Sequence, residues 1–284
     1  MDWRKSKQIL IVALIILNIF LYVGVRQKYS VGVVETKEKT MATLQDELLR
    51  SGIKIDAAIP TEIGDNIFIL DVAYEQYNPR AYNEKIFLGN GEVSLPVDGV
   101  VTVSYKKEKI EFMKRGEISY ENNSVKSEEM VSESEALNTI ALDFFSVFGI
   151  SSRDMHLDTI SRSESGKGYK LQYGKIHRGI PLETAYTVVE IEGGAVVKMN
   201  RRWLMVEKEG DKPSEVADPY KVLFSLVGDE SLRGKTIKSI ELCNYFDDEA
   251  GAYITEGESI VRGRAFPAWR IRFDDGVYKI LEEK

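Results

Sequence analysis

The sequence has almost no cysteine or histidine. Among 284 residues, Cys243 is the single cysteine, and His156 and His177 are the two histidines. One cysteine excludes an internal disulfide, so the fold has to be stabilised by burial alone. No His-x-x-x-His or Cys-x-x-Cys pair is present, which leaves almost no ligand set for zinc. We expect both histidines to be ordinary surface or edge residues.

Catalytic and phosphate-binding motifs are missing as well. The chain contains no Gly-x-Ser-x-Gly and no Gly-x-Gly-x-x-Gly. Ser104–Lys107 spells Ser-x-x-Lys, but it lies in a predicted strand, whereas that motif needs a helix N-terminus. Adjacent acids at Asp247–Glu249 and Asp274–Asp275 make poor catalytic pairs, since neighbours in a strand point to opposite faces, and we expect them in turns or solvated loops. We therefore predict that the chain is not an enzyme and binds no cofactor or metal.

The charge of the chain is acidic, at −7 in total. Residues 1–28 contain five of the 38 Lys and Arg and one of the 45 Asp and Glu, which leaves 33 basic and 44 acidic side chains, or −11, for residues 29–284. A surface of that charge is a poor binder of nucleic acid or anionic lipid. We expect no nucleic-acid partner.

The N-terminal region contains an uncharged apolar run over residues 8–25. At about 1.5 Å per residue, 18 helical residues extend roughly 27 Å, close to the thickness of a bilayer core. The run is longer than that of a signal peptide, and no small-residue cleavage site follows it. We expect a cytoplasmic tail at 1–7, a transmembrane helix at 8–25 and a stalk at 26–45. The expected location is the cell membrane, single-pass, with a cytoplasmic N-terminus and an extracellular C-terminal domain.

One polar residue, Asn18, interrupts the middle of this run. Its amide is either merely tolerated or is satisfied by a hydrogen bond from a partner helix. We take Asn18 as the candidate partner contact, with the small residues Ala13 and Gly24 allowing close approach. Trp3 and Tyr22 are the expected interfacial anchors on either side of the run.

Helices in the rest of the chain are predicted by caps and apolar spacing. Asn78-Pro79 and Asp218-Pro219 each place a capping side chain before a proline at the first helical position. The strongest pattern covers Ala136–Phe148 and is closed by Gly149. Another apolar face precedes Gly52 and consists of Met41, Leu44, Leu48 and Leu49.

Strands are predicted by alternation with glycines at the breaks, above all in an antiparallel meander over residues 155–208, whose last predicted strand covers residues 195–208. A polar run from Asn122 to Glu135 separates these strands from an earlier group and is typical of a linker. We expect a first α+β subdomain at 46–127 and a second α+β domain at 128–284. The predicted fold class is therefore α+β: one N-terminal transmembrane helix followed by an extracytoplasmic ectodomain of helices packed on antiparallel meander sheets.

Three stretches resemble a known family: Tyr173–Leu182 with the following "TVVEIEGGAVVKMN", the segment "AFPAWRIRFDDGVYKI", and the opening "MDWRKSKQILIVALIILNIFLYV". They resemble YycI, also called WalI, the membrane-anchored regulatory protein of the WalK/WalR (YycG/YycF) two-component system of low-GC Gram-positive bacteria. The resemblance covers nearly the whole chain by order and length. It implies a single membrane helix and a mixed α/β ectodomain related to two domains of the companion protein YycH.

Three functions remain open on these grounds. The first is a membrane-tethered regulator that associates with a WalK-like sensor histidine kinase and a YycH-like protein, through the membrane helix and the ectodomain, and modulates signalling in cell-wall homeostasis. The second is a tethered PepSY-like binding or inhibitory module for an extracytoplasmic enzyme or cell-wall fragment. The third is an anchored hydrolase whose site no motif spells out. The resemblance favours the first.

The near-absence of cysteine and metal ligands generates a first prediction. The domain that begins near residue 45 should fold alone, and neither a chelator nor a mild reductant should move its thermal transition, because it needs neither metal nor disulfide. Calorimetry with and without EDTA and dithiothreitol measures this. Loss of the transition in either reagent would contradict the prediction.

Overall fold

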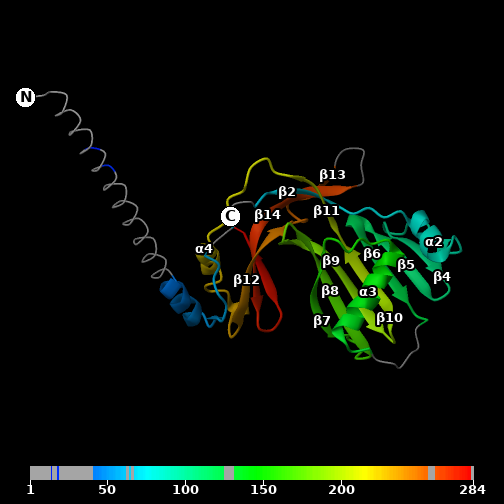
Figure 1. Cartoon of the computed structure of the whole chain (residues 1–284), viewed down its shortest axis with the longest axis horizontal. Helices are drawn as coiled ribbons and strands as arrows, with labels where there is room; N and C mark the ends of the chain where they lie inside the picture. Colours follow the sequence, from blue (N-terminus) through cyan, green and yellow to red (C-terminus); the bar gives the residue numbers. More distant parts are fainter. Residues whose placement is uncertain are drawn as a thin grey trace, which may run out of the picture. The chain divides into compact units, whose positions relative to one another are not determined.

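The computed structural model describes residues 14, 18, 41–61, 64, 67–124, 131–254 and 260–282. It is mostly a large mixed sheet, with 44% of the described residues in strands and 21% in helices (Figure 1). The expected fold class, with one transmembrane helix before helices on antiparallel meander sheets, is therefore wrong. The sheet is mixed because some strands far apart in the sequence pair in parallel, as Lys54–Ile55 does with Thr236–Ile237.

The expected membrane location is also corrected. Within the part of the chain that the structure describes, no helix combines the length and the apolar character needed to cross a membrane. The expected span at 8–25 lies outside the described residues except for Leu14 and Asn18, which are helical and exposed. The other residues predicted there, which also lie outside, are Trp3, Ala13, Tyr22 and Gly24.

The chain divides into two compact units, each built from segments on both sides of the subdomain boundary expected at residue 127. Unit 1 comprises residues 1–59, 218–240 and 271–278, and unit 2 comprises residues 60–217, 241–270 and 279–284. Two long strands, β12 (Thr236–Tyr245) and β14 (Val261–Phe273), contribute residues to both units.

Unit 1 contains helical residues 41–50, β1 (Lys54–Ile55), α4 (Pro219–Phe224) and the 3-10 turn η2 (Glu230–Leu232). Its buried core includes Leu44, Leu48, Ile53, Leu223, Leu226, Leu232, Ile237 and Ile271.

Local signals for this unit are largely confirmed. The Asp218 side chain accepts a hydrogen bond of 2.9 Å from the Tyr220 N–H, with Pro219 at the first turn of α4. Gly52 has a φ of 81°, as expected after a helix end, and its carbonyl accepts from Gly234 N at 2.8 Å. Leu49 departs from the predicted apolar face, since its side chain is exposed.

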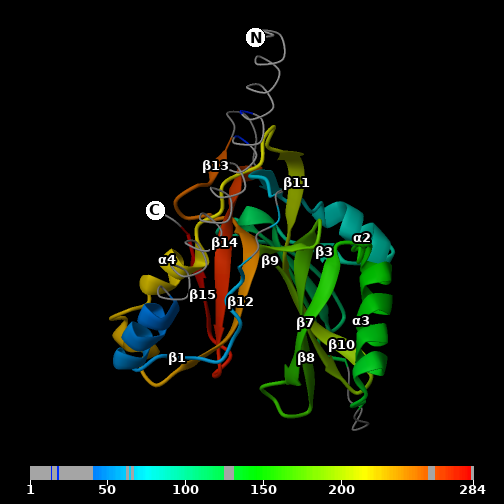
Figure 2. The same cartoon turned by 60° about the vertical axis from the view of Figure 1, so that its left-hand side comes forward.

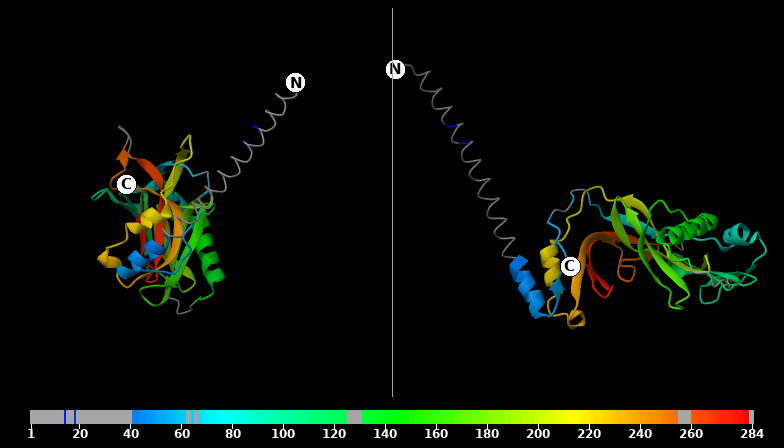
Figure 3. Two further views of the ribbon diagram at one scale, coloured as in Figure 1. Left: turned by 90° about the vertical axis from the view of Figure 1, so that its left-hand side faces the viewer. Right: turned by 60° about the horizontal axis from the view of Figure 1, so that its bottom comes forward.

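Unit 2 is organised around an antiparallel run of strands with two helices, α2 and α3, on one face (Figures 2 and 3). In spatial order the strands are β3 (Glu92–Val93), β4 (Val101–Tyr105), β5 (Glu108–Met113), β6 (Glu117–Asn122), β10 (Ala195–Arg202), β9 (Ile180–Glu192), β8 (Gly168–His177) and β7 (Met155–Arg162). The predicted meander is confirmed as far as residue 202 by the antiparallel pairing of β7 to β10. Pairing of β6 with β10 joins strands from before and after the expected linker.

Other strands pair with β2 (Leu70–Tyr74) or with its neighbour β14. On one side β2 pairs with β11 (Leu204–Glu209), and on the other with β14. Two short strands, β13 (Tyr253–Ile254) and β15 (Tyr278–Leu281), also pair with β14. The stretch read as one strand from Ala195 onward is thus two, separated by the buried Trp203, because its second half pairs with β2 instead of β9.

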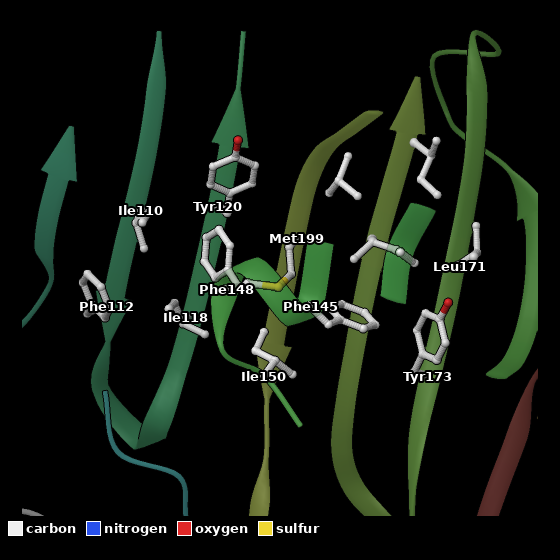
Figure 4. Close-up of a cluster of buried hydrophobic side chains, with 14 of the residues drawn as sticks. Ile110, Phe112, Ile118, Tyr120, Phe145, Phe148, Ile150, Leu171, Tyr173 and Met199 are labelled. Atoms are coloured by element: carbon white, nitrogen blue, oxygen red, sulfur yellow. The ribbon is translucent and has the colours of Figure 1, made fainter. Parts of the chain in front are cut away.

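Helix α3 (Ser134–Phe148) supplies the centre of the largest core (Figure 4). The ring centroids of Phe145 and Tyr173 are 5.2 Å apart, and those of Tyr120 and Phe148 are 5.1 Å apart, in edge-to-face arrangements that favour aromatic attraction. Gly149 ends the helix with a φ of 77°, as predicted. Helix α2 (Pro79–Phe87) adds Phe87 to the same cluster.

This packing predicts which residue of α3 the fold requires. Replacing Phe145→Ala should lower the free energy of unfolding by about 3–5 kcal/mol, because the fully buried ring leaves a cavity. Val147→Ala, on the exposed side of the same helix, should cost less than about 0.5 kcal/mol. Urea denaturation of both variants measures the difference, and equal losses would contradict the prediction.

Candidate interaction surface

Four large aliphatic side chains are exposed within ten consecutive residues of unit 2. Leu88 is 80%, Leu95 85%, Val97 69% and Val93 43% exposed. We call residues 88–97 the aliphatic segment. Single exposed aliphatic residues are normal on a soluble protein, whereas a local group of them is typical of a contact surface.

The aliphatic segment starts where α2 ends. Asn78 caps the start of α2 through hydrogen bonds from Arg80 N and Ala81 N, at 3.0 and 3.2 Å. At the other end Leu88 adopts a left-handed conformation, with φ 52° and ψ 35°. That conformation costs an L-residue with a Cβ about 1–2 kcal/mol. Glycine would adopt this conformation without that cost. The sequence nevertheless has an exposed leucine at this position.

The backbone of the segment is held in place by hydrogen bonds to the Asn83 side chain and to the backbone of Thr102. Asn83 of α2 accepts from Gly91 N at 2.8 Å and donates to Gly91 O at 2.9 Å. A Cβ at Gly91 would lie only 2.5 Å from Asn83 Oδ1, so only glycine allows this approach. Further along, Ser94 N donates to Thr102 O at 2.8 Å. The aliphatic side chains are therefore displayed by an ordered backbone.

Strand β3, inside this segment, is an edge strand. It pairs with β4 through Glu92↔Ser104 and Val93↔Val103, and the spatial order of the described strands ends with it. Unpaired backbone groups at such an edge can receive a strand from a partner. Because β3 has only two residues, the side chains are the larger part of what this edge offers.

The charges within this stretch of chain are negative, and one cation from outside it, Lys114, packs against its end at Gly99. In residues 88–99 the charged side chains are Glu92 and Asp98, with no Lys or Arg. Glu84 of α2 adds a carboxylate next to Gly89. A complementary surface would be apolar at its centre and basic at its rim.

The two histidines do not form a site. His177 Nε2 lies 2.8 Å from Glu209 Oε1, which Arg178 Nε also contacts at 2.8 Å. His156 Nε2 lies 3.7 Å from Asp158 Oδ1. No cluster of three or more His, Cys, Asp or Glu placed to hold a metal ion occurs in the described ranges.

The acidic pairs singled out in the sequence have structural roles. In unit 2, Asp247 accepts from Glu249 N and Ala250 N at 3.0 and 3.1 Å, which makes a turn. In unit 1, Asp274 accepts from Thr236 N at 3.1 Å, and its pKa is lowered mainly by that backbone hydrogen bond. The predicted turn and loop settings of these residues are confirmed.

Asp248 makes more side-chain contacts than Asp247 does. It accepts a hydrogen bond of 2.8 Å from the Tyr74 hydroxyl, and Arg115 Nη1 and Arg202 Nη1 each lie 3.4 Å from the same oxygen. The pKa of Tyr74 is raised, first by burial and then by this hydrogen bond. Three donors on one oxygen orient the carboxylate.

Sequence reasoning missed a buried ionic cluster around Arg201, which is 1% exposed. Its Nη2 lies 2.8 Å from Glu75 Oε2, its Nη1 donates to Thr187 Oγ1 at 2.7 Å, and its guanidinium lies 4.2 Å from the ring centroid of Trp203. Burial also raises the pKa of Tyr77, whose hydroxyl contacts both ions. The alternation of the strand could have predicted that Arg201 is buried, because Arg201 lies on the same face of β10 as the buried Met199.

No protein-family model matches the chain, and no curated protein matches it. The resemblance to the YycI family therefore stays a prediction from the residues quoted above.

The strained leucine generates a prediction about stability. Leu88→Gly should raise the free energy of unfolding by about 0.5–1 kcal/mol, because glycine adopts the left-handed conformation without steric cost. Leu95→Gly is the matched control: it is equally exposed but not left-handed, and should lose about 0.5 kcal/mol. Chemical denaturation of both variants measures this. A less stable Leu88→Gly would show that folded-state contacts hold Leu88.

Proposed function

We propose that the chain is a regulatory binding protein that associates with a WalK-like sensor histidine kinase and a YycH-like companion, and so modulates two-component signalling in cell-wall homeostasis. The observation that carries the proposal is the aliphatic segment: an exposed, acidic-rimmed row of Leu88, Val93, Leu95 and Val97 on an ordered sheet edge. The resemblance to YycI gives the identity of the partners. The proposal involves no catalytic step.

The energetics of the segment suit a regulatory contact. Full burial of one Leu or Val side chain contributes about 1.5–3 kcal/mol. Two or three such side chains contribute about 3–9 kcal/mol, which is comparable to the entropic cost of association of about 4–15 kcal/mol, so a surface of this size gives a weak and reversible complex. A regulator that has to release its partner needs that range of affinity.

The rigidity of the segment adds to this argument. A disordered loop would lose backbone conformational entropy on binding, about 1–2 kcal/mol for each residue that becomes ordered. Here the Asn83–Gly91 hydrogen bonds and the Ser94–Thr102 hydrogen bond already fix the backbone. More of the burial energy is then available to hold the partner.

A binding or inhibitory module for an enzyme or cell-wall fragment is the second candidate. The observation that favours it is the layer of α2 and α3 on one face of an antiparallel sheet, the arrangement expected of a PepSY-like module. This second function would use the same aliphatic segment, but the partner would be an enzyme or a cell-wall fragment in place of the kinase.

The test changes the surface without changing the core. In the full-length protein, Leu95→Asp combined with Val97→Asp should weaken association with the kinase and the companion at least tenfold, because each buried carboxylate replaces a buried aliphatic group. Val277→Asp, at a 46% exposed valine of unit 1, should bind as the wild type does. Co-purification followed by a titration of the purified partners measures both variants.

Two outcomes would contradict the proposal. Undiminished association of the double variant would place recognition elsewhere. Recovery of a hydrolase or a glycan fragment in place of the kinase, lost in the double variant and kept in Val277→Asp, would establish the second candidate instead. Matching thermal transitions of all three proteins exclude unfolding as the cause.

A further inference from the structure

A pocket of about 370 Å³ opens in unit 2 beside the 3-10 turn η1 (Lys114–Gly116). Its volume is at the lower end of the range of small-molecule sites. Phe112, Met113 and Val261 give it an apolar wall, and Gln76 lies at its side. The ring of Phe112 and the side chain of Val261 are almost fully buried, so this wall is part of the packed interior.

The charged side chains that line the pocket are both cations, Lys114 and Arg115. This contrasts with a chain of net charge −7. Lys114 has no ion-pair partner in the described part of the chain. Arg115 reaches Asp248 only at 3.4 Å, longer than the 2.7–2.9 Å typical of a charge-assisted hydrogen bond, and shares that oxygen with Arg202 and Tyr74.

The backbone holds Arg115 at this position despite a steric cost. Arg115 is left-handed, with φ 59° and ψ 33°, and is followed by Gly116 with φ 62°. A Cβ at Gly116 would lie 2.5 Å from Glu75 O and 2.7 Å from Tyr74 Cβ, so η1 is pressed against the end of β2. Strained non-glycine residues are concentrated at ligand sites, where the surrounding structure supports them.

We infer that this pocket binds a small amphipathic carboxylate. The carboxylate group would lie between Lys114 and Arg115, and a short aliphatic or aromatic group would lie against Phe112, Met113 and Val261. Guanidinium groups bind carboxylates in a bidentate manner, and the long contact to Asp248 leaves Arg115 able to do so. The inference is independent of the kinase association, which uses the aliphatic segment.

The test uses three probes on the full-length protein: octanoate, octanol and acetate. Octanoate carries both chemical features, octanol lacks the charge, and acetate lacks the chain. Calorimetric titration should give octanoate an affinity at least tenfold higher than either of the others. Octanol binding as tightly as octanoate, or no octanoate binding at all, would overturn the inference.

Variants then locate the anion. Arg115→Asn removes the cation, and asparagine tolerates the left-handed backbone, so the fold should survive while octanoate affinity falls at least tenfold. Lys106→Asn is a matched control, because Lys106 is also exposed and left-handed, with φ 57°, but lies at the opposite end of β5. It should bind octanoate as the wild type does. Equal losses in both variants, or none in Arg115→Asn, would contradict an anion site at η1.

Discussion

The buried charge of Arg201 is the constraint on which the candidate sites of unit 2 depend. A guanidinium at 1% exposure is tolerated only when each face of it is satisfied. Glu75, Tyr77 and Thr187 supply the hydrogen bonds and Trp203 supplies the ring face. These partners come from β9, from Trp203 between β10 and β11, and from the residues just after β2, so one side chain fixes where three segments meet.

The segment that leaves this meeting point builds both candidate sites. Glu75 is followed by Gln76 and Tyr77, which line the pocket, and then by Asn78, which caps α2. Helix α2 carries Asn83, whose amide holds the aliphatic segment. Gly116 of the pocket packs against the backbone of Glu75 itself. Loss of the Arg201–Glu75 pair would therefore disturb the two surfaces together, although neither surface contains Arg201.

Local chemistry in the sequence predicted local structure well. The proline-flanked caps at Asn78 and Asp218, the glycine end of α3, and the alternation of β7 to β10 all depend on neighbours a few residues away. Two pairings could not be predicted: β1 with β12 in parallel, and β11, which follows Trp203, with β2. Hydrogen bonding between strands that are distant in the sequence produces no periodic pattern in it. The membrane-anchored location was expected from hydropathy and is not supported by any helix among the described residues.

The aliphatic segment shows why the sequence alone does not predict which apolar side chains are exposed. Val93, Leu95 and Val97 alternate, and period-two alternation normally predicts a strand with one buried face. Whether that face is buried depends on what packs over it, and in the folded chain these side chains stay exposed.

Contacts in the folded chain also engage the polar side chains that the sequence offered as catalytic candidates. Catalytic carboxylates and histidines have to face a substrate with part of their hydrogen-bonding capacity open. Here Asp248 is oriented by Tyr74 and two arginines, and His177 is held by Glu209. The exposed groups at the two candidate surfaces are different: aliphatic side chains on an ordered edge, and the cations Lys114 and Arg115 beside an apolar pocket. Aliphatic side chains and cations of this kind provide affinity for partners and ligands.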